Sequence, residues 1–188
     1  FYIFLGVLIF VLSFIVYVYF TKTPYFETFL AWSRSNLILF VTIVLILKII
    51  GVVYPPLPSA IFTIGAIPIL GWLPAYLLDL TGSIIAGTID YFLGKKYGFP
   101  LLNKIFDKQV IQKLKNLKIK PNREIESVIV LRTLLGGVLL EAVYYGAGLL
   151  NIKFQNFIVG AVVSHAILGV PTFLIGETIF KSRNALIS

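Results

Sequence analysis

The chain has 188 residues, of which 59% are hydrophobic and only 13% are charged. A soluble domain of this size cannot bury so much apolar surface, so the composition excludes a soluble protein and indicates an integral membrane protein. Cysteine is absent, which excludes a disulfide framework and thiol chemistry.

The net charge of +8 lies in one segment of the chain. Between Lys95 and Arg123 there are nine Lys or Arg and a single acid, Asp107, whereas the remainder of the chain is neutral. A nucleic-acid site can be this basic, but this segment lies between predicted membrane spans and has few aromatic residues on which bases could stack. The positive-inside rule makes it a cytoplasmic loop. We therefore expect no nucleic-acid partner.

Four apolar stretches are candidate membrane spans. Residues 1–20 lack a basic n-region and a small-residue cleavage site, so they predict a membrane anchor and not a signal peptide. A short polar connector over Lys22–Arg34 follows. The other predicted spans are Asn36–Tyr54, Ala75–Leu93 and Phe154–Glu177. A straight span needs about 20 apolar residues, which the first, third and last stretches supply. Lys48 and Glu177 lie near span ends and are expected to snorkel to the interface.

The stretch "YPPLPSAIFTIGAIPILGWLP", Tyr54–Pro74, is apolar but contains five prolines and two glycines. Pro58 lies near its start, and Gly65 and Pro68 fall near its middle. Such breaks are tolerated at membrane depth only where protein or a water-filled cavity covers the backbone. We predict a re-entrant hairpin over about residues 55–74, made of two half-helices that enter and leave on one side.

A second broken stretch, Ser127–Leu150, is interrupted at Gly136 and Gly137. Each broken stretch precedes an unbroken span, and the cytoplasmic loop between them sets the two hairpins on opposite faces, as an inverted repeat. Interrupted helices at matching positions of two halves indicate a transport site near the bilayer midplane. The alternative is that both stretches are kinked spans, because Pro and Gly are common in membrane helices.

Acidic residues mark the third span. Asp79 and Asp90 are eleven residues apart, about three helical turns, and form one stripe with Ser83 and Ala86. Intramembrane charges usually face a cavity or a partner and mark a pathway. Either aspartate is a candidate for carrying a coupled proton. The alternative for Asp90 is simple hydration at the cytoplasmic end.

Arg132 and Glu141 lie on either side of the second break. A guanidinium group suits a phosphate, so Arg132 is the predicted headgroup contact, and Glu141 is a further proton candidate. Alternatively the two residues form a structural pair. His165, the single histidine, could relay protons or form hydrogen bonds between helices. No second His or Cys accompanies it, so we expect no metal, and nothing indicates another cofactor.

The basic loop contains an amphipathic pattern. Its apolar residues recur with helical period, and its lysines fall largely on other faces, which predicts a helix on the membrane surface against anionic headgroups. The alternative is a solvated helix packed on its own protein. The apolar residues are Leu101, Leu102, Ile105, Phe106, Val110, Ile111, Leu114 and Leu117, and the lysines are Lys104, Lys108, Lys115 and Lys118.

The segment "GSIIAGTIDYFLGKKYG", Gly82–Gly98, resembles the glycine, tyrosine and basic signature of the DedA and VTT-domain superfamily, also called SNARE-associated Golgi proteins. The stretches "VLRTLLGG", "GAGLLNIKFQNFIVGAVV" and "GVPTF" are similar to that family's second half, and the last fits its TVP-type branch. The resemblance covers roughly Tyr54–Ile179. It implies a lipid transporter: the family includes eukaryotic scramblases and bacterial flippases of polyprenyl-phosphate carriers, some of them dependent on the proton gradient.

The resemblance also implies roles for particular residues. Arg132 corresponds to the family's first arginine, Tyr91 to the signature tyrosine, and the region of Pro58 and Gly65 to the first re-entrant loop. The chain departs from the flippase pattern at three places. Ser59 and Ala60 stand where that pattern has a glutamate. The pattern's second arginine falls near Val138, and its acid falls at Gly87, with Asp90 close by. These departures argue against proton-coupled polyprenyl-phosphate transport and leave phospholipid translocation open.

The sequence therefore predicts an all-α polytopic membrane protein with two opposed re-entrant hairpins in one transmembrane domain, residues 1–188. Its parts are N-terminal spans at 1–53, a VTT-like core at 54–179 with hairpins at about 55–74 and 127–150, and the basic loop at 95–123.

The predicted function is movement of phosphate-bearing headgroups of membrane phospholipids or polyprenyl phosphate, without enzymatic activity, in a prokaryotic plasma membrane. A homo-oligomer stays open. The alternatives are a proton-coupled transporter of a small solute or ion, and a non-transporting membrane scaffold.

Overall fold

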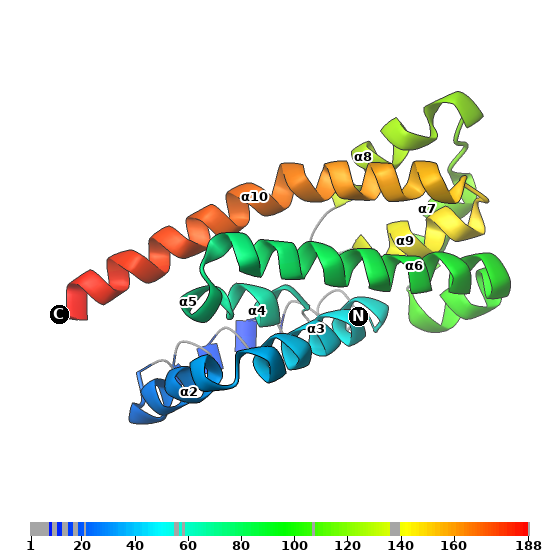
Figure 1. Ribbon diagram of the computed structural model, residues 1–188. Helices are drawn as coiled ribbons and strands as arrows, with labels where there is room; N and C mark the ends of the chain where they lie inside the picture. The colour runs from blue at the N-terminus through cyan, green and yellow to red at the C-terminus, as the bar shows by residue number, and fades with distance from the viewer. Residues whose placement is uncertain are drawn as a thin grey trace.

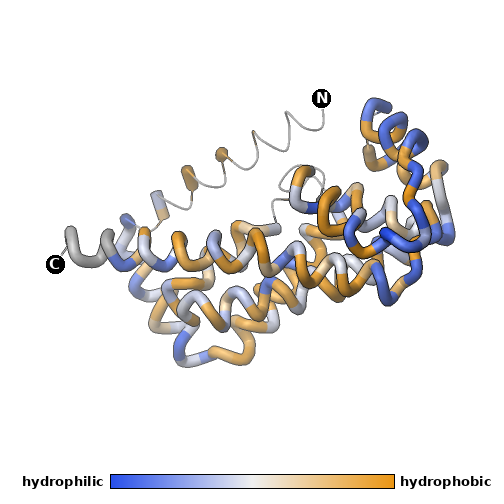
Figure 2. Tube along the Cα trace, turned by 90° about the horizontal axis from the view of Figure 1, so that it is seen from above, coloured by the Kyte–Doolittle hydropathy of each residue, from blue (hydrophilic) through white to orange (hydrophobic). Residues whose placement is uncertain are grey.

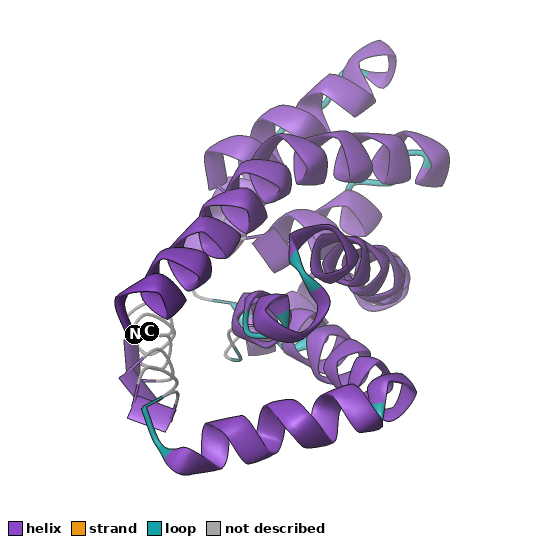
Figure 3. Cartoon of the chain, turned by 60° about the vertical axis from the view of Figure 1, so that its left-hand side comes forward, coloured by secondary structure: helices purple, strands orange, loops and turns teal. Residues whose placement is uncertain are grey.

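The structure is a computed structural model that describes residues 22–54, 57, 59–106, 108–135 and 140–187, with seven scattered positions before residue 21, and omits the side chains of residues 135, 140 and 182–187. Every regular element in these ranges is helical (Figure 3). In chain order the elements are α2 (Pro24–Ser35), α3 (Leu37–Val53), α4 (Ser59–Ile64), α5 (Ile67–Leu70), α6 (Trp72–Ile105), α7 (Lys108–Asn116), η1 (Pro121–Arg123), α8 (Glu124–Leu135), α9 (Leu140–Leu149) and α10 (Phe154–Ile187).

Two long antiparallel helices, α6 and α10, form the centre of the molecule (Figure 1). Tyr91 of α6 stacks on Phe157 of α10 at one level, and Tyr76 meets Phe173 at the other, so the helices run in opposite directions. Among the described residues, Trp72–Ile105 and Phe154–Lys181 are long and apolar enough to cross a bilayer. The predicted all-α membrane fold is confirmed.

The first helical hairpin lies at a different place from the one predicted. The chain reverses between the end of α3 at Val53 and the start of α4 at Ser59, where Lys48 Nζ lies 3.4 Å from Ser59 Oγ. The arms are therefore α3 and α4–α5, and the predicted second span, Asn36–Tyr54, corresponds to α3. Gly65 only separates α4 from α5, and Pro68 begins α5. The early prolines Pro55, Pro56 and Pro58 lie outside the described residues.

The second helical hairpin pairs α8 with α9, at the residues the sequence predicts, and its re-entry into the membrane stays a prediction. Arg132 of α8 lies over the ring of Tyr144 of α9, with its guanidinium carbon 5.1 Å from the ring centroid. One turn earlier in α8, Val128 belongs to the same apolar cluster as Ala147 of α9, so the arms are antiparallel. The predicted break at Gly136 and Gly137 lies outside the described residues.

Each hairpin precedes one of the two long helices, which have 34 residues each. Because α6 and α10 are antiparallel, the units α3–α6 and α8–α10 have opposite orientations, consistent with the predicted inverted repeat. The Tyr145 hydroxyl of α9 also links the two units, because it donates to the Val53 carbonyl at the end of α3, at 3.0 Å. The neighbouring Val52 belongs to the same apolar cluster as Ala86, near the middle of α6.

Two predictions about the N-terminal region need separate comment. The predicted span at residues 1–20 lies almost wholly outside the described residues. The predicted polar connector Lys22–Arg34 is wrong, because this segment forms helix α2, which meets α3 at a bend of 105°. The proline at its first turn and the aromatic contacts of Phe29 with Trp32 and Phe40 stabilise this short helix.

The basic loop forms helix α7, preceded by a continuation of α6 beyond a kink at Gly98. Hydrophilic residues gather at this end of the molecule (Figure 2). The apolar face of α7, including Val110, Ile111 and Leu114, packs against Ala142 and Tyr145 of α9. This is the arrangement of the alternative interpretation, a helix packed on its own protein. The four predicted surface lysines, Lys104, Lys108, Lys115 and Lys118, are exposed, and their contact with lipid stays a prediction.

Glycines allow α6 and α9 to touch through their backbones. A Cβ atom at Gly148 would collide with the backbone carbonyl of Tyr91, and one at Gly94 would collide with that of Tyr145. Small residues at such contacts are the usual means of close helix packing in membranes, where packing replaces the hydrophobic driving force. The core of the molecule therefore has little tolerance for added volume at this crossing.

We predict that Gly148→Ala lowers stability by about 1–3 kcal/mol, because rigid backbone has to move to admit the methyl group. Gly146→Ala is the matched control on the same helix. Its Cβ would meet only the terminal methyl of Leu114, at 2.9 Å, and alanine gains about 1 kcal/mol of helix propensity. Thermal unfolding in detergent, followed by helical circular dichroism, compares the two. Equal midpoints would contradict the close-packing argument.

Candidate functional site

The first part of the site is a buried ion pair between α3 and the long helix α6 of the first unit. Lys48 of α3 lies 2.7 Å from Oδ1 of Asp79 on α6, and both side chains are below a tenth exposed. Thr63 of α4 donates to the same carboxylate oxygen at 2.5 Å. The predicted snorkelling of Lys48 is therefore wrong. Gly82 is the local reason, because a Cβ there would lie 2.6 Å from Lys48 Cγ, so only glycine lets the lysine lie along α6.

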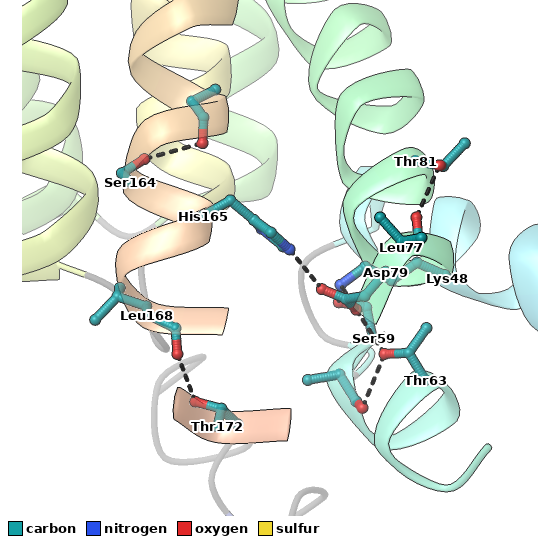
Figure 4. Close-up of polar contacts among 12 residues, drawn as sticks. Lys48, Ser59, Thr63, Leu77, Asp79, Thr81, Ser164, His165, Leu168 and Thr172 are labelled. Atoms are coloured by element: carbon teal, nitrogen blue, oxygen red, sulfur yellow. Dashed lines mark hydrogen bonds and ion pairs between the residues drawn. The ribbon is translucent and has the colours of Figure 1, made fainter. Parts of the chain in front are cut away.

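His165 of α10 continues this chain of contacts to the second unit. Its Nε2 lies 3.0 Å from Oδ2 of Asp79, across the interface between the long helices (Figure 4). Its Nδ1 lies 2.8 Å from Nη2 of Arg132 on α8. Of the two roles considered for this histidine, the geometry matches the contact between helices. The imidazole links the ion pair of the first unit to the arginine of the second.

Arg132 is the far end of the chain and is only 2% exposed. Its Nη1 donates to the carbonyl of Ala161 and to Ser164 Oγ on α10, while Tyr144 covers the guanidinium face. Among the described residues no carboxylate lies within ion-pair distance of it, so the predicted alternative of an Arg132–Glu141 pair is not what the structure has. All the acceptors that the structure describes for this arginine are neutral groups.

The contacts of Arg132 fix the tautomer of His165. An arginine side chain can only donate hydrogen bonds, so the Nδ1 atom that faces it has to accept. An imidazole that accepts at Nδ1 carries its proton on Nε2, the atom that faces the Asp79 carboxylate. These contacts therefore hold His165 in its neutral form, because a second proton on Nδ1 would place two donors opposite each other. With Lys48, Asp79 and Arg132 ionised and His165 neutral, the four side chains together have one positive charge in excess.

A small cavity adjoins Arg132 and His165. It lies between α6, α8, α9 and α10, and Ser83 of α6 also lines it. Ser83 Oγ and Arg132 Nε are buried, and neither has a hydrogen-bond partner among the described residues. Buried donors without a partner are uncommon in proteins, and such a donor usually binds a ligand, a water or an ion. Two donors without a described partner therefore belong to residues that line this cavity.

The remaining predicted transport residues lie elsewhere. Asp90 is fully buried, so simple hydration is wrong, but it lies three turns from Asp79 and its carboxylate accepts no hydrogen bond from a described residue. Glu141 is half-buried in the first turn of α9. Tyr91 donates to the Ile152 carbonyl at 2.6 Å and belongs to the apolar core. Of the predicted transport residues, the structure brings together Asp79 and Arg132, through His165, and not the other three.

Sequence reasoning missed some members of the chain. Lys48 lies within the predicted span Asn36–Tyr54, and its partner could have been sought among the nearby acids, since intramembrane charges usually pair. Thr63, Ser164 and Tyr144 gave no comparable signal, because hydroxyl and aromatic residues are common in membrane helices. Their roles depend on which helices become neighbours.

We predict strong energetic coupling within the buried ion pair. Lys48→Met or Asp79→Asn alone leaves one charge unpaired and costs about 3–5 kcal/mol. The double variant removes both charges and should unfold closer to the wild-type temperature than the sum of the single effects predicts. A double-mutant cycle on thermal or denaturant unfolding in micelles measures the coupling.

The exposed pair Lys181–Glu177, at 3.2 Å with Lys181 74% exposed, is the matched control. For Lys181→Met and Glu177→Gln we expect coupling below about 1 kcal/mol, as for surface ion pairs in general. Additive effects at Lys48 and Asp79 would contradict the pairing described above.

Comparison with known proteins identifies the chain. The family model of the VTT domain matches residues 57–178, more than half of the chain. An uncharacterized protein of Methanocaldococcus jannaschii is 34% identical over 62 residues, a segment that spans 32% of this chain and 39% of that relative. No solved structure matches. The chain belongs to the VTT domain family of membrane proteins.

Proposed function

We propose that this protein moves phosphate-bearing lipid headgroups across the bilayer, with phospholipids as the substrates of a scramblase or flippase. The headgroup would pass through the polar interior where the two units meet, while the acyl chains stay in lipid. Binding and release are sufficient for such transport, and no covalent step is needed. The basic loop supports a cytoplasmic position for the α7 end, and a prokaryotic plasma membrane is the proposed location.

The observation that carries the proposal is the uncompensated charge of Arg132. This guanidinium is buried, has only neutral acceptors and keeps Nε free of any described partner. An unpaired charge at membrane depth costs at least about 2.5 kcal/mol, so it is retained where it serves a function. A phosphate offers both the negative charge and the several oxygens that a guanidinium recognises.

Proton-coupled transport of a small solute is the second candidate, and the buried, unpartnered carboxylate of Asp90 favours it. It requires a path closed to lipid, whereas headgroup transport requires one open to lipid at the side. The two proposals therefore differ in whether a lipid with a large label on its acyl chain can be moved. A scaffold without transport would depend on the loop lysines and be indifferent to Arg132.

The test is a liposome assay with the full chain and phosphatidylglycerol labelled on an acyl chain with a dithionite-sensitive fluorophore. Wild-type protein should expose inner-leaflet label to external dithionite. Arg132→Ala should slow this exchange about 10- to 150-fold, because losing a charge-assisted hydrogen bond costs about 1.5–3 kcal/mol. Arg132→Lys should retain an intermediate rate, since lysine keeps the charge without the planar fork.

Arg34→Ala is the control, because it removes the same charge from an exposed position on α2. Its rate should equal that of wild type. Equal bleaching in wild-type and protein-free vesicles would exclude headgroup transport, and an undiminished Arg132→Ala rate in a folded variant would remove Arg132 from the path. A pH gradient across the same vesicles separates driven from passive exchange.

A further inference from the structure

Two of the residues that line the small cavity beside Arg132 carry donors suited to an oxyanion, although the cavity has no room for one. Arg132 Nε and Ser83 Oγ have no hydrogen-bond partner among the described residues, and both side chains are nearly fully buried. His165 forms another part of the wall, and its Nδ1 occupies the acceptor position on Arg132 Nη2. An oxyanion on Arg132 would need that position as well.

We propose that the headgroup phosphate binds in this cavity to Arg132 and Ser83 and displaces His165 from Arg132. His165 then takes up a proton at Nδ1 and keeps Asp79 as its partner. The inference rests on the proposed function and deepens it, because it names a second binding residue, Ser83, and an exchange residue, His165. The described state is then the unliganded, closed one. Arg132 and Ser83 are binding residues, and His165 is a positioning residue that acts through Arg132.

The exchange conserves charge. Before binding, the chain of Lys48, Asp79, His165 and Arg132 has one positive charge in excess. A phosphodiester headgroup adds one negative charge, and the proton on His165 Nδ1 adds one positive charge, so the excess is unchanged. The proton comes from water and forms a new N–H bond on the lone pair that Arg132 gives up. Asp79, already 3.0 Å from Nε2, is the counter-ion of the imidazolium.

The groups facing His165 set the direction of the pH effect. Asp79 and Tyr76 face it from α6, Arg132 from α8, and Lys48 lies behind Asp79 on α3. Without a phosphate, the cations Arg132 and Lys48 oppose a second proton on the imidazole of His165. Once a phosphate neutralises Arg132, the carboxylate of Asp79 favours this second proton. Binding therefore takes up a proton, and by linkage lower pH favours binding.

The single histidine makes the exchange directly observable. Histidine-selective ¹⁵N NMR of the full chain in micelles should show one imidazole, unprotonated at Nδ1 and protonated at Nε2. Adding dihexanoyl phosphatidylglycerol near pH 6 should protonate both nitrogens. Dihexanoylglycerol, which lacks the phosphate, should leave the tautomer unchanged. An unchanged imidazole with saturating phosphatidylglycerol would overturn the inference.

Inorganic phosphate in a parallel sample identifies the source of the anion. If only the phospholipid protonates the ring, the exchange serves a lipid headgroup, as proposed. If inorganic phosphate acts equally, displacement of His165 still holds, and the headgroup assignment of the proposed function is overturned.

Variants test the same exchange in the liposome assay. Because binding takes up a proton, the wild-type rate should rise as the pH is lowered from about 7.5 to about 5.5. His165→Gln keeps an acceptor for Arg132 but cannot take up the proton, so its rate should be independent of pH in this range. A His165→Gln profile that rises like that of wild type would contradict the proposal.

Ser83→Ala should reduce the rate about two- to tenfold at either pH, as expected for one neutral hydrogen bond. Ser33→Ala is the matched control, since Ser33 is also buried without a hydrogen-bond partner but lies on α2. Equal rates for the two serine variants would remove Ser83 from the site. If Arg132→Ala abolishes transport while Ser83→Ala and His165→Gln behave as wild type, this inference fails and the proposed function stands.

Discussion

The contact on which the fold and the site both depend is that of Asp79 with Lys48 on one side and His165 on the other. An isolated carboxylate in the interior of an apolar bundle is costly, and it persists because a cation and a proton donor reach it from two different helices. The requirement fixes the relative heights of α3, α6 and α10. It also means that the polar groups of the two units are parts of one connected set.

The hairpins explain how so many polar groups can meet at that depth. The short arms pack against the long helices, and the two units are linked where the Tyr145 hydroxyl of α9 donates to the Val53 carbonyl at the end of α3. The same arrangement brings α8, and with it Arg132, within reach of the carbonyls and hydroxyls of α10.

Neutral acceptors distinguish Arg132 from Lys48. The lysine has an acidic partner in direct contact, so its charge is already compensated and its contribution is structural. The arginine has a carbonyl, a hydroxyl, an imidazole and the face of Tyr144, which orient the guanidinium without neutralising it. A site in which the orienting groups are neutral keeps its attraction for an anion. The structure thus separates a charge with a carboxylate partner, that of Lys48, from one whose described partners are all neutral, that of Arg132.

Much of this protein could be predicted without coordinates. Composition required a membrane protein, because so much apolar surface has no other solvent, and periodicity with Pro and Gly breaks predicted two hairpins each followed by a long helix. Motif spacing indicated the VTT family, and intramembrane charge singled out Asp79 and Arg132. The position of the first turn was wrong. Gly65 and Pro68 were as plausible a break as Tyr54–Pro58, since sequence shows where a helix can break but not where the chain reverses.

Only the tertiary structure decided which charges are partners. Lys48 and Asp79 are 31 positions apart in the sequence, and His165 and Arg132 lie on elements whose neighbours depend on how the two units pack. A charged residue inside an apolar stretch can be recognised from its sequence neighbours, so the sequence identified Asp79 and Arg132 as candidates. Its compensation comes from whatever side chain the fold brings within about 3–4 Å, because charge-assisted contacts act at that range. That is a property of the packed bundle, which no stretch of the chain contains.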